Sequence, residues 1–399
     1  MAEATGDARG HHPGSRGYAR ILVALLAAGI ATFAQLYSPQ SILPIIARDF
    51  GVSPAQAGLM ISVATLGVVV GLLPWSVIAD RSGRVRTMSF SLVAAGVFAV
   101  VLPFAPTFEI LLAIRFLEGA ALAGLPAIAI AYLHEEVSAR FTAIAAGTYI
   151  SGTTIGGLLG RLLAVPVTEL VDWRWGLGSV AVVSIVSASV FIIVAPEPRG
   201  FVRSSSRGFW RAVGALLRRG RLLALIAQGF LLMGAFVSVY NYLGFRLEAP
   251  PFALAPVLTS LLFLAYLSGT WSSRRIGLVV ARRGRRMALL SGIAAMAAGA
   301  LLTLSSALPV IVIGLVVLTA GFFAAHSVAA EWVGHEALTG RAQASSLYNI
   351  GYYAGSSLLG WIGGLAFGAA SWPGMIAIVT LLCGASAGIA LALPDRSRE

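Results

Sequence analysis

Long apolar runs restrict the fold of this chain more than any other feature. Twelve of them are separated by short segments that carry charged or turn-forming residues. They cover residues 21–46, 55–79, 87–105, 108–133, 142–166, 174–195, 222–245, 255–279, 287–305, 309–333, 341–368 and 372–393. A helix that crosses a bilayer needs about 20 mostly apolar residues, so twelve need about 240. The sequence supplies close to that number, because 58% of its 399 residues are hydrophobic and only 11% are charged. It therefore predicts an all-α membrane protein with twelve transmembrane helices.

The basic residues exclude several kinds of chemistry. All 28 of them are arginine, and the formal net charge is +12. Without lysine, the chain can form neither a Walker A phosphate loop nor a lysine Schiff base. Its only cysteine, Cys383, lies in an apolar run, which excludes an internal disulfide and a thiolate-rich metal site. We therefore expect no bound metal and no cofactor.

The positions of the arginines predict the topology. With the N-terminus inside, all but five lie in cytoplasmic segments or at the cytoplasmic ends of spans, and the exceptions are Arg48, Arg115, Arg161, Arg174 and Arg246. Arginine near short loops resists translocation, so both termini are expected in the cytoplasm. The positive charge is then explained by topology and by contact with anionic membrane lipids, without nucleic acid as a partner. The exclusive use of arginine suggests a high-GC bacterial genome, and hence the bacterial inner membrane.

The longest break between the apolar runs divides the chain into two sets of six helices. It predicts a cytoplasmic linker at 196–221 between an N-terminal bundle at 21–195 and a C-terminal bundle at 222–393. Short cytoplasmic tails are expected at 1–20 and 394–399.

The two halves repeat with an offset of 201 residues. The second apolar run is followed by Asp80-Arg81-Ser82-Gly83-Arg84, and the eighth by Ala281-Arg282-Arg283-Gly284-Arg285. Arg140 and Arg341, which precede the fifth and eleventh runs, show the same offset. Two homologous six-helix halves are typical of transporters whose substrate site lies between the repeats near the bilayer midplane.

Three segments resemble signature motifs of the major facilitator superfamily. Ser76-x-x-x-Asp80-Arg81-x-Gly83-Arg84 is similar to motif A, which usually begins with glycine. Leu111-x-x-x-Arg115-x-x-Glu118-Gly119 is similar to motif B, which usually has glutamine at the position of Glu118. Gly152-Thr153-x-x-Gly156-Gly157 is similar to the antiporter motif C, with Thr153 in place of proline. The tract from Tyr37 to Arg84 also resembles bacterial exporters of the YnfM type. The resemblance implies the fold of this superfamily, in which two six-helix bundles are related by pseudo-symmetry.

The motif A loop has a physical explanation. Gly83 permits a tight turn between two helix ends, while Asp80 can pair with Arg81 or Arg84 or cap an opposing helix. The resemblance implies a latch that holds one access state, with Asp80 facing the start of the eleventh span. The alternative is that the arginines only mark the cytoplasmic side. Ala281 replaces the aspartate in the second copy, so the two loops cannot be equivalent latches.

Four ionisable residues fall clearly inside the predicted spans, namely Arg115, Glu118, Arg161 and His326. An ionised group in hydrocarbon costs roughly 2.5–3.5 kcal/mol on insertion scales, so each needs a partner or a function. Arg115 and Glu118 are three residues apart on one helix face, which is close enough to pair. They form either a structural ion pair, with Arg161 as a third member, or a proton site in which Arg115 tunes Glu118. The resemblance to motif B associates its arginine with proton coupling.

His326 lies in the inner half of the tenth span. It is either a second proton site or a hydrogen-bonding group for substrate, because histidine titrates near neutral pH. The alternative is a neutral histidine that bonds to a helix carbonyl or to Ser327.

Polar side chains within the spans predict a substrate cavity that does not require a charged substrate. The residues concerned are Gln35, Tyr37, Gln40, Tyr149, Gln228, Tyr240, Asn241, Asn349 and Tyr352. The resemblance implies that spans one, four, seven and ten surround this cavity. Pro39, Pro44, Pro126 and the motif C glycines predict kinks and close helix contacts.

These features together predict a secondary active transporter, namely a proton-coupled exporter that exchanges a small organic molecule for protons by alternating access. An uncoupled facilitator or a proton symporter of a sugar or metabolite would keep the same fold. An integral membrane enzyme is disfavoured, because the sequence has no His-Glu-x-x-His, no GxSxG and no acidic cluster for metal-bound phosphate chemistry. We expect a monomer whose partners are its substrate, protons and membrane lipids, with the proton gradient as the energy source.

Overall fold

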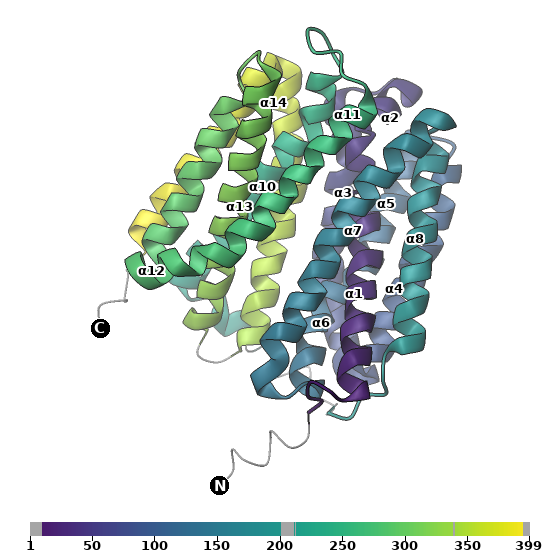
Figure 1. Cartoon of the computed structure of the whole chain (residues 1–399), viewed down its shortest axis with the longest axis vertical. Helices are drawn as coiled ribbons and strands as arrows, with labels where there is room; N and C mark the ends of the chain where they lie inside the picture. The colour runs from purple at the N-terminus through teal and green to yellow at the C-terminus, as the bar shows by residue number, and fades with distance from the viewer. Residues whose placement is uncertain (1–9, 201–210, 212, 338–339, 394–399) are drawn as a thin grey trace. The chain divides into compact units, whose positions relative to one another are not determined.

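The structure, a computed structural model, describes residues 10–200, 211, 213–337 and 340–393. Nearly all of these residues are helical, and the chain separates into two compact units (Figure 1). Much of the predicted linker (201–210 and 212) and parts of both predicted tails (1–9 and 394–399) lie outside the described residues. The predicted domain boundaries therefore stay predictions.

The first unit comprises Met1–Pro39 and Leu66–Arg207. It contains the second half of α3 (Pro54–Ser82) and the helices α1 (Arg16–Tyr37), α4 (Arg84–Val101), α5 (Phe108–Leu122), α6 (Gly124–Glu136), α7 (Thr142–Leu170) and α8 (Trp173–Val194). Two 3₁₀ helices, η2 (Leu102–Phe104) and η3 (Ala139–Phe141), connect them. Within this unit, α1 packs against α7 and α8, and α4 packs against α5, α6 and α8.

The motif C glycines allow α7 to approach α1 closely. Gly152, Gly156 and Gly160 each face the α1 backbone, at Leu26, Ile30 and Ala34 respectively, and an added Cβ atom would collide with a carbonyl oxygen there. The spacing of four residues is the small-residue pattern by which membrane helices bring their backbones together. The predicted close helix contact at Gly152 and Gly156 is therefore confirmed. Gly157 points elsewhere, toward Arg161.

The second unit comprises Gln40–Thr65 and Gly208–Glu399. It contains the first half of α3 and the helices α2 (Leu43–Phe50), α10 (Gly220–Leu247), α11 (Pro256–Leu261), α12 (Tyr266–Leu302), α13 (Leu308–Glu336) and α14 (Arg341–Ala392), together with the 3₁₀ helix η4 (Leu262–Ala265). Gly351 and Gly355 of α14 face Ile226 and Phe230 of α10. The helices that correspond to spans seven and eleven are thus packed through glycine, as spans one and five are in the other half.

Ten helices of the described chain are long and apolar enough to cross a membrane. Two of them are much longer than a single crossing requires, and each contains non-helical residues where the sequence predicts a loop between two spans. α12 is interrupted at Gly284, and α14 at Ala370 and Ser371. If each of these helices crosses twice, the total is twelve; the count itself stays a prediction.

The predicted first span is not one continuous helix. α1 ends at Tyr37, a 3₁₀ turn η1 follows over Ser38–Ser41, and α2 begins at Leu43. Pro39 lies in this turn, as expected for a residue that cannot donate a backbone hydrogen bond. The predicted fourth span is likewise divided between α5 and α6 at Ala123, three residues before Pro126.

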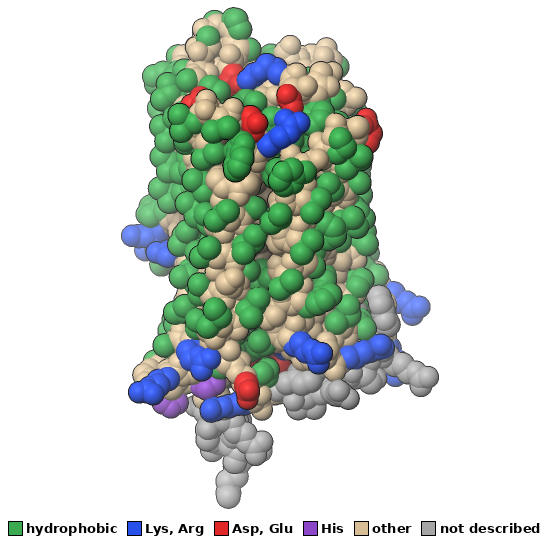
Figure 2. Space-filling view, turned by 90° about the vertical axis from the view of Figure 1, so that its right-hand side faces the viewer, with side chains coloured by type: hydrophobic (Ala, Val, Ile, Leu, Met, Phe, Trp, Pro, Cys, Tyr) green, Lys and Arg blue, Asp and Glu red, His purple; other side chains and the backbone are tan. Residues whose placement is uncertain are grey.

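The surface has the character of a membrane protein. Hydrophobic side chains cover much of the face drawn in Figure 2, and most of its charged side chains gather toward the two ends. Large apolar residues such as Phe104, Ile193 and Leu381 are well exposed. Exposed apolar surface on this scale requires a lipid environment, which agrees with the ten membrane-spanning candidates.

Candidate functional site

The break at the end of α1 organises the charged interior of the first unit. In a continuous helix the backbone N–H of residue 39 would donate to the carbonyl of Gln35, but Pro39 has no N–H to give. Arg115 of α5 reaches these carbonyls instead: its Nη1 donates to Gln35 O at 3.3 Å and its Nη2 to Leu36 O at 2.7 Å. The arginine therefore compensates for hydrogen bonds that the broken helix cannot make.

The same guanidinium pairs with Glu118. Arg115 Nη1 lies 2.6 Å from Glu118 Oε2, and the two residues are 0% and 1% exposed. The pairing expected from their spacing on α5 is confirmed. Its geometry contains a feature that spacing alone could not predict, because Arg115 is held by backbone carbonyls as well as by the carboxylate.

Arg161 approaches the same helix break from α7. Its guanidinium lies 4.9 Å from the centroid of the Tyr37 ring, and its Nη1 donates to Gly157 O at 2.6 Å. Arg161 is 2% exposed, and such a stacked arginine is stabilised by the quadrupole of the aromatic ring. We call Gln35, Tyr37, Arg115, Glu118 and Arg161 the charged cluster. Gln35 Oε1 is buried there and has no hydrogen-bond partner among the residues described.

The motif A loop forms a three-membered ion-pair network. Arg84 Nη1 lies 2.6 Å from Asp80 Oδ1, and Arg84 Nη2 lies 2.8 Å from Glu135 Oε1 at the end of α6. Gly83 has φ of 96°, which is a conformation that glycine adopts readily and other residues do not, as the predicted tight turn requires. Arg81 is exposed. Of the alternatives that the sequence leaves open for Asp80, the structure shows the pairing with Arg84, whereas the contact with Glu135 is not predicted.

His326 of α13 lies in an aromatic environment in the second unit. Its Nδ1 is 2.9 Å from the hydroxyl of Tyr348, and its ring stacks on Phe322 and lies 4.9 Å from that of Tyr352. A tyrosine hydroxyl can donate to or accept from a histidine nitrogen, so this bond suits a neutral imidazole. Tyr348 is thus a partner that the sequence does not single out for His326, although the two residues are only 22 positions apart.

The remaining polar residues of the second unit form bonds within it. Gln228 bonds to the hydroxyl and the carbonyl of Ser386, and Tyr240 Oη lies 2.7 Å from Thr319 Oγ1. Gln40 Nε2 donates to Asn241 Oδ1 at 2.6 Å.

The other predicted cavity residues are placed as follows. Asn349 and Tyr352 are partly exposed. Tyr149, in the first unit, is buried, and its hydroxyl has no partner within the described chain. Their roles as substrate ligands stay predictions.

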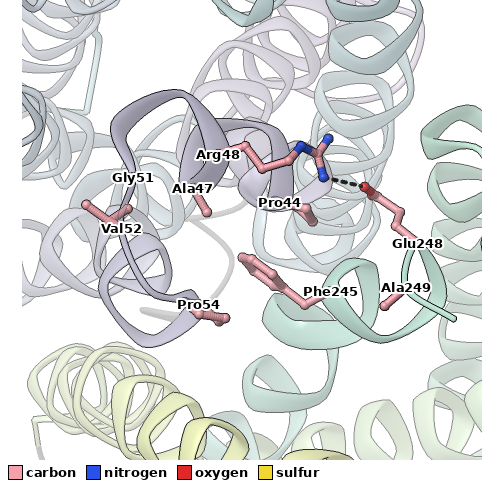
Figure 3. A pocket seen from close by; sticks show the side chains of 9 residues that line it. All are labelled: Pro44, Ala47, Arg48, Gly51, Val52, Pro54, Phe245, Glu248 and Ala249. Atoms are coloured by element: carbon pink, nitrogen blue, oxygen red, sulfur yellow. Dashed lines mark ion pairs between the residues drawn. The ribbon is translucent and has the colours of Figure 1, made fainter.

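A pocket of about 370 Å³ lies between α2 and the end of α10 (Figure 3). Pro44, Ala47 and Phe245 contribute to its wall, and an ion pair of 3.6 Å joins Arg48 to Glu248 at its edge. Glu248 is largely buried whereas Arg48 is exposed. This pair links the segment after the first span to the end of the seventh, and no local pattern in the sequence predicts it.

Within the described residues, no group of three or more histidine, cysteine, aspartate or glutamate side chains is arranged to hold a metal ion. The charged cluster instead combines one carboxylate, that of Glu118, with two guanidinium groups and one amide, all of them buried.

Comparison with known proteins agrees with this architecture. The family described as Major Facilitator Superfamily matches residues 24–323. The uncharacterized transporter YybF of Bacillus subtilis is 38% identical over 367 residues, which are 92% of this chain and 91% of that protein. The inner membrane transport protein YnfM of Escherichia coli is 39% identical over 371 residues, which are 92% of this chain and 89% of that protein.

Solved structures show the same fold. The crystal structure of a point mutant of the nucleoside transporter NupG has a TM-score of 0.76 at 15% identity, with 93% of this chain and 98% of that chain covered. A bacterial homologue of the human lysosomal transporter Spinster, in an inward-facing conformation, has a TM-score of 0.75 at 17% identity. The match covers 95% of this chain and 97% of that chain. The helices, the motifs and these similarities lead to one conclusion: the chain belongs to the Major Facilitator Superfamily and is a multi-pass membrane transporter.

Proposed function

We propose that this transporter is a proton-coupled exporter, which exchanges a small organic molecule for protons by alternating access. It would lie in the bacterial inner membrane as a monomer with both termini in the cytoplasm, and it would use the proton gradient as its energy source. The observation that carries the proposal is the buried pair of Arg115 and Glu118 beside the break in α1.

The hydrogen bonds of Arg115 favour a coupling role over a purely structural one. Removing the charge of one partner usually leaves a buried ion uncompensated, which is strongly destabilising. Here Arg115 also donates to Gln35 O and Leu36 O, so its guanidinium keeps two acceptors when Glu118 is neutral. Glu118 can therefore gain and lose a proton without leaving Arg115 isolated, and this is what a coupling carboxylate must do.

Alternating access requires gates, and we assign this role to two further contacts. On the predicted inner side, the network of Asp80, Arg84 and Glu135 would stabilise one access state. On the predicted outer side, Gln40 Nε2 donates to Asn241 Oδ1 inside the second unit, and these two positions are separated by the 201-residue offset of the repeat. We propose that this bond breaks when the outer side opens.

A proton-flux assay tests the proposal. Inverted vesicles that contain the full chain would be energised and challenged with a broad panel of organic compounds, while the internal pH is followed. We expect at least one compound to dissipate the gradient in the wild type, and this response to disappear in Glu118→Gln. Glu109→Gln is the matched control, because Glu109 lies on the same helix but is exposed at its first turn.

Either of two results would contradict coupling. In the first, Glu118→Gln retains the compound-dependent dissipation. In the second, the wild type moves a labelled sugar or metabolite at a rate that does not depend on the gradient, which would favour the uncoupled facilitator. Uptake that increases with the inward proton gradient would favour the symporter.

A further inference from the structure

The part of α12 that precedes Gly284 carries an exposed basic face on a helix that otherwise has the composition of a membrane span. Trp271, Arg275, Leu278 and Arg282 follow one another at intervals of four, three and four residues, so they lie on one face of the helix. Trp271 and Leu278 are 63% and 56% exposed, and Arg275 and Arg282 are also exposed. Arg274 and Arg283, the neighbours of these arginines, are exposed as well. We call these six residues the basic face of α12.

Two of these arginines, Arg274 and Arg275, lie inside the predicted span at 255–279, near its cytoplasmic end. Gly284, with φ of 80°, marks the turn between the two parts of α12. Arg275 lies nine residues before it, which corresponds to about 14 Å along the helix axis. At that depth a guanidinium costs free energy unless it reaches an anionic partner at the headgroup level, and a long arginine side chain can do so along the helix.

The first half of the chain shows that topology alone does not require these arginines. At the offset of 201 residues, Arg274 and Arg275 correspond to Leu73 and Pro74, and Trp271 corresponds to Val70. Arg282 corresponds to Arg81, close to the turn, where both copies carry arginines that the positive-inside rule explains. The deeper pair is thus an addition specific to the second half.

No described acidic side chain pairs with this face. Among the residues that the structure describes, Arg274, Arg275, Arg282 and Arg283 form no ion pair, whereas the next arginine, Arg285, pairs with Glu331 at 3.0 Å. Arg275 lies 5.9 Å from the centroid of the Trp271 ring. A tryptophan beside basic residues is typical of the membrane interface, where the ring packs under the headgroups and the cation reaches a phosphate.

We infer that the basic face of α12 binds an anionic phospholipid. The guanidinium groups of Arg274 and Arg275 would bind the phosphate oxygens, since the planar arginine fork matches them, while Trp271 and Leu278 would contact the glycerol backbone and the acyl chains. Arg282 and Arg283, nearer the turn, would add electrostatic attraction to the same headgroup. This site is separate from the charged cluster, and it does not depend on what the protein transports.

Native mass spectrometry of the purified full-length chain tests the inference. The protein would be titrated separately with phosphatidylglycerol, phosphatidylcholine and inorganic phosphate. We expect phosphatidylglycerol to bind clearly more tightly than phosphatidylcholine, and inorganic phosphate to bind weakly because it lacks the acyl chains. Arg274→Gln with Arg275→Gln should weaken phosphatidylglycerol binding about 30-fold, given the attraction that each arginine contributes near anionic lipid.

The matched control is Arg140→Gln with Arg341→Gln. It removes the same charge from two exposed arginines that the repeat relates, and it should leave phosphatidylglycerol binding within about twofold of the wild type. Unchanged binding in the Arg274/Arg275 variant, or an equal loss in the control, would overturn the site. If that variant does not fold, the lipid preference of the wild type is the test. Equal binding of phosphatidylglycerol and phosphatidylcholine by the wild type would also overturn the site.

Discussion

The two halves of this transporter share a repeat but differ in what they bury. The charged cluster places Arg115, Glu118 and Arg161 inside the first unit. The positions related to them by the 201-residue offset are Val316, Thr319 and Ile362, none of which carries a charge. Thr319 bonds to the hydroxyl of Tyr240, so the second unit satisfies the corresponding region with a neutral hydrogen bond.

The difference follows from one residue in each first helix. Pro39 corresponds to Tyr240, and the helix breaks at Pro39 but continues through Tyr240 in α10. At the break, Arg115 donates to the carbonyls of Gln35 and Leu36, and the hydroxyl of Ser38 also donates to that of Gln35. Glu118 balances the charge of Arg115. Where the helix is unbroken, no arginine is needed. The helix break and the buried ion pair therefore occur together as one structural feature, and we propose that its role is proton coupling.

The largest expected effect comes from removing the arginine. Arg115→Leu would leave Glu118 buried without its counter-charge. It would also remove the arginine donor from the carbonyls of Gln35 and Leu36, of which the first keeps the hydroxyl of Ser38 as a donor. We expect the free energy of unfolding to fall by about 3–5 kcal/mol, as for other broken buried pairs. Thermal or denaturant unfolding in detergent measures this loss.

The matched control is Val316→Leu, at the corresponding position of the second half, where the side chain is exposed and the change should be small. If the two variants had the same free energy of unfolding, the Arg115–Glu118 pair would not stabilise the helix break as we propose.

The next effect concerns the break itself. Pro39→Ala would supply a backbone N–H for Gln35 O, so the first helix could continue as α10 does. The hydrogen bond from Arg115 to Gln35 O would then no longer be needed. We expect transport to fall several-fold, while the free energy of unfolding changes by only about 1 kcal/mol. Pro44→Ala is the control, because Pro44 lies in the first turn of α2, where a missing N–H costs little. Equal transport by both variants would show that the break is not needed.

The motif A loops offer a smaller contrast. The side chains of Arg84 and Asp80 are 12% and 18% exposed, whereas Arg285 and Glu331 in the second copy are 28% and 48% exposed. We expect Asp80→Asn to reduce transport several-fold through loss of the latch, with a change of about 1 kcal/mol or less in stability. Ala281→Asp, which restores the carboxylate to the second copy, should leave the transport rate close to that of the wild type. Similar transport rates for the two variants would contradict the asymmetry of the loops.

The smallest effect is expected for the exposed pair of the second copy. Glu331→Gln removes the partner of Arg285 and of His335, but exposed ion pairs contribute only about 0–1 kcal/mol. Unfolding of this variant in detergent should therefore be close to that of the wild type. A loss as large as that of Arg115→Leu would mean that the second loop also holds the fold together.

Much of the fold could be predicted because apolar runs and the positions of Pro and Gly are local properties of the sequence. The break near Pro39, the turns at Gly83 and Gly284, and the close contacts of Gly152 and Gly156 all follow from single residues. The ends of the helices could not be placed as well. The apolar run at 21–46 predicts one span, whereas the structure has two helices, α1 and α2, separated by a short 3₁₀ turn. The turn consists of few residues inside a long apolar run, so hydropathy does not reveal it.

The site could be predicted only where its partners are close in sequence. Arg115 and Glu118 are three residues apart, and Asp80 and Arg84 four, so helical spacing is sufficient to pair them. Glu135 is 51 residues from Arg84, and Gln35 is 80 residues from Arg115. Such contacts depend on how helices pack, and a single sequence carries no local signal for them. From position alone, Glu135 and Glu331 are therefore expected to be interfacial residues rather than partners of arginine.

We propose that Glu118 couples transport to protons without being needed for substrate binding or for the change between access states. The most direct test uses purified protein in proteoliposomes and a substrate found by the proton-flux assay, with transport measured in two modes. Our account predicts that Glu118→Gln still exchanges labelled for unlabelled substrate across the membrane, but no longer accumulates substrate when a proton gradient is imposed. Accumulation at the wild-type level in Glu118→Gln would contradict the account.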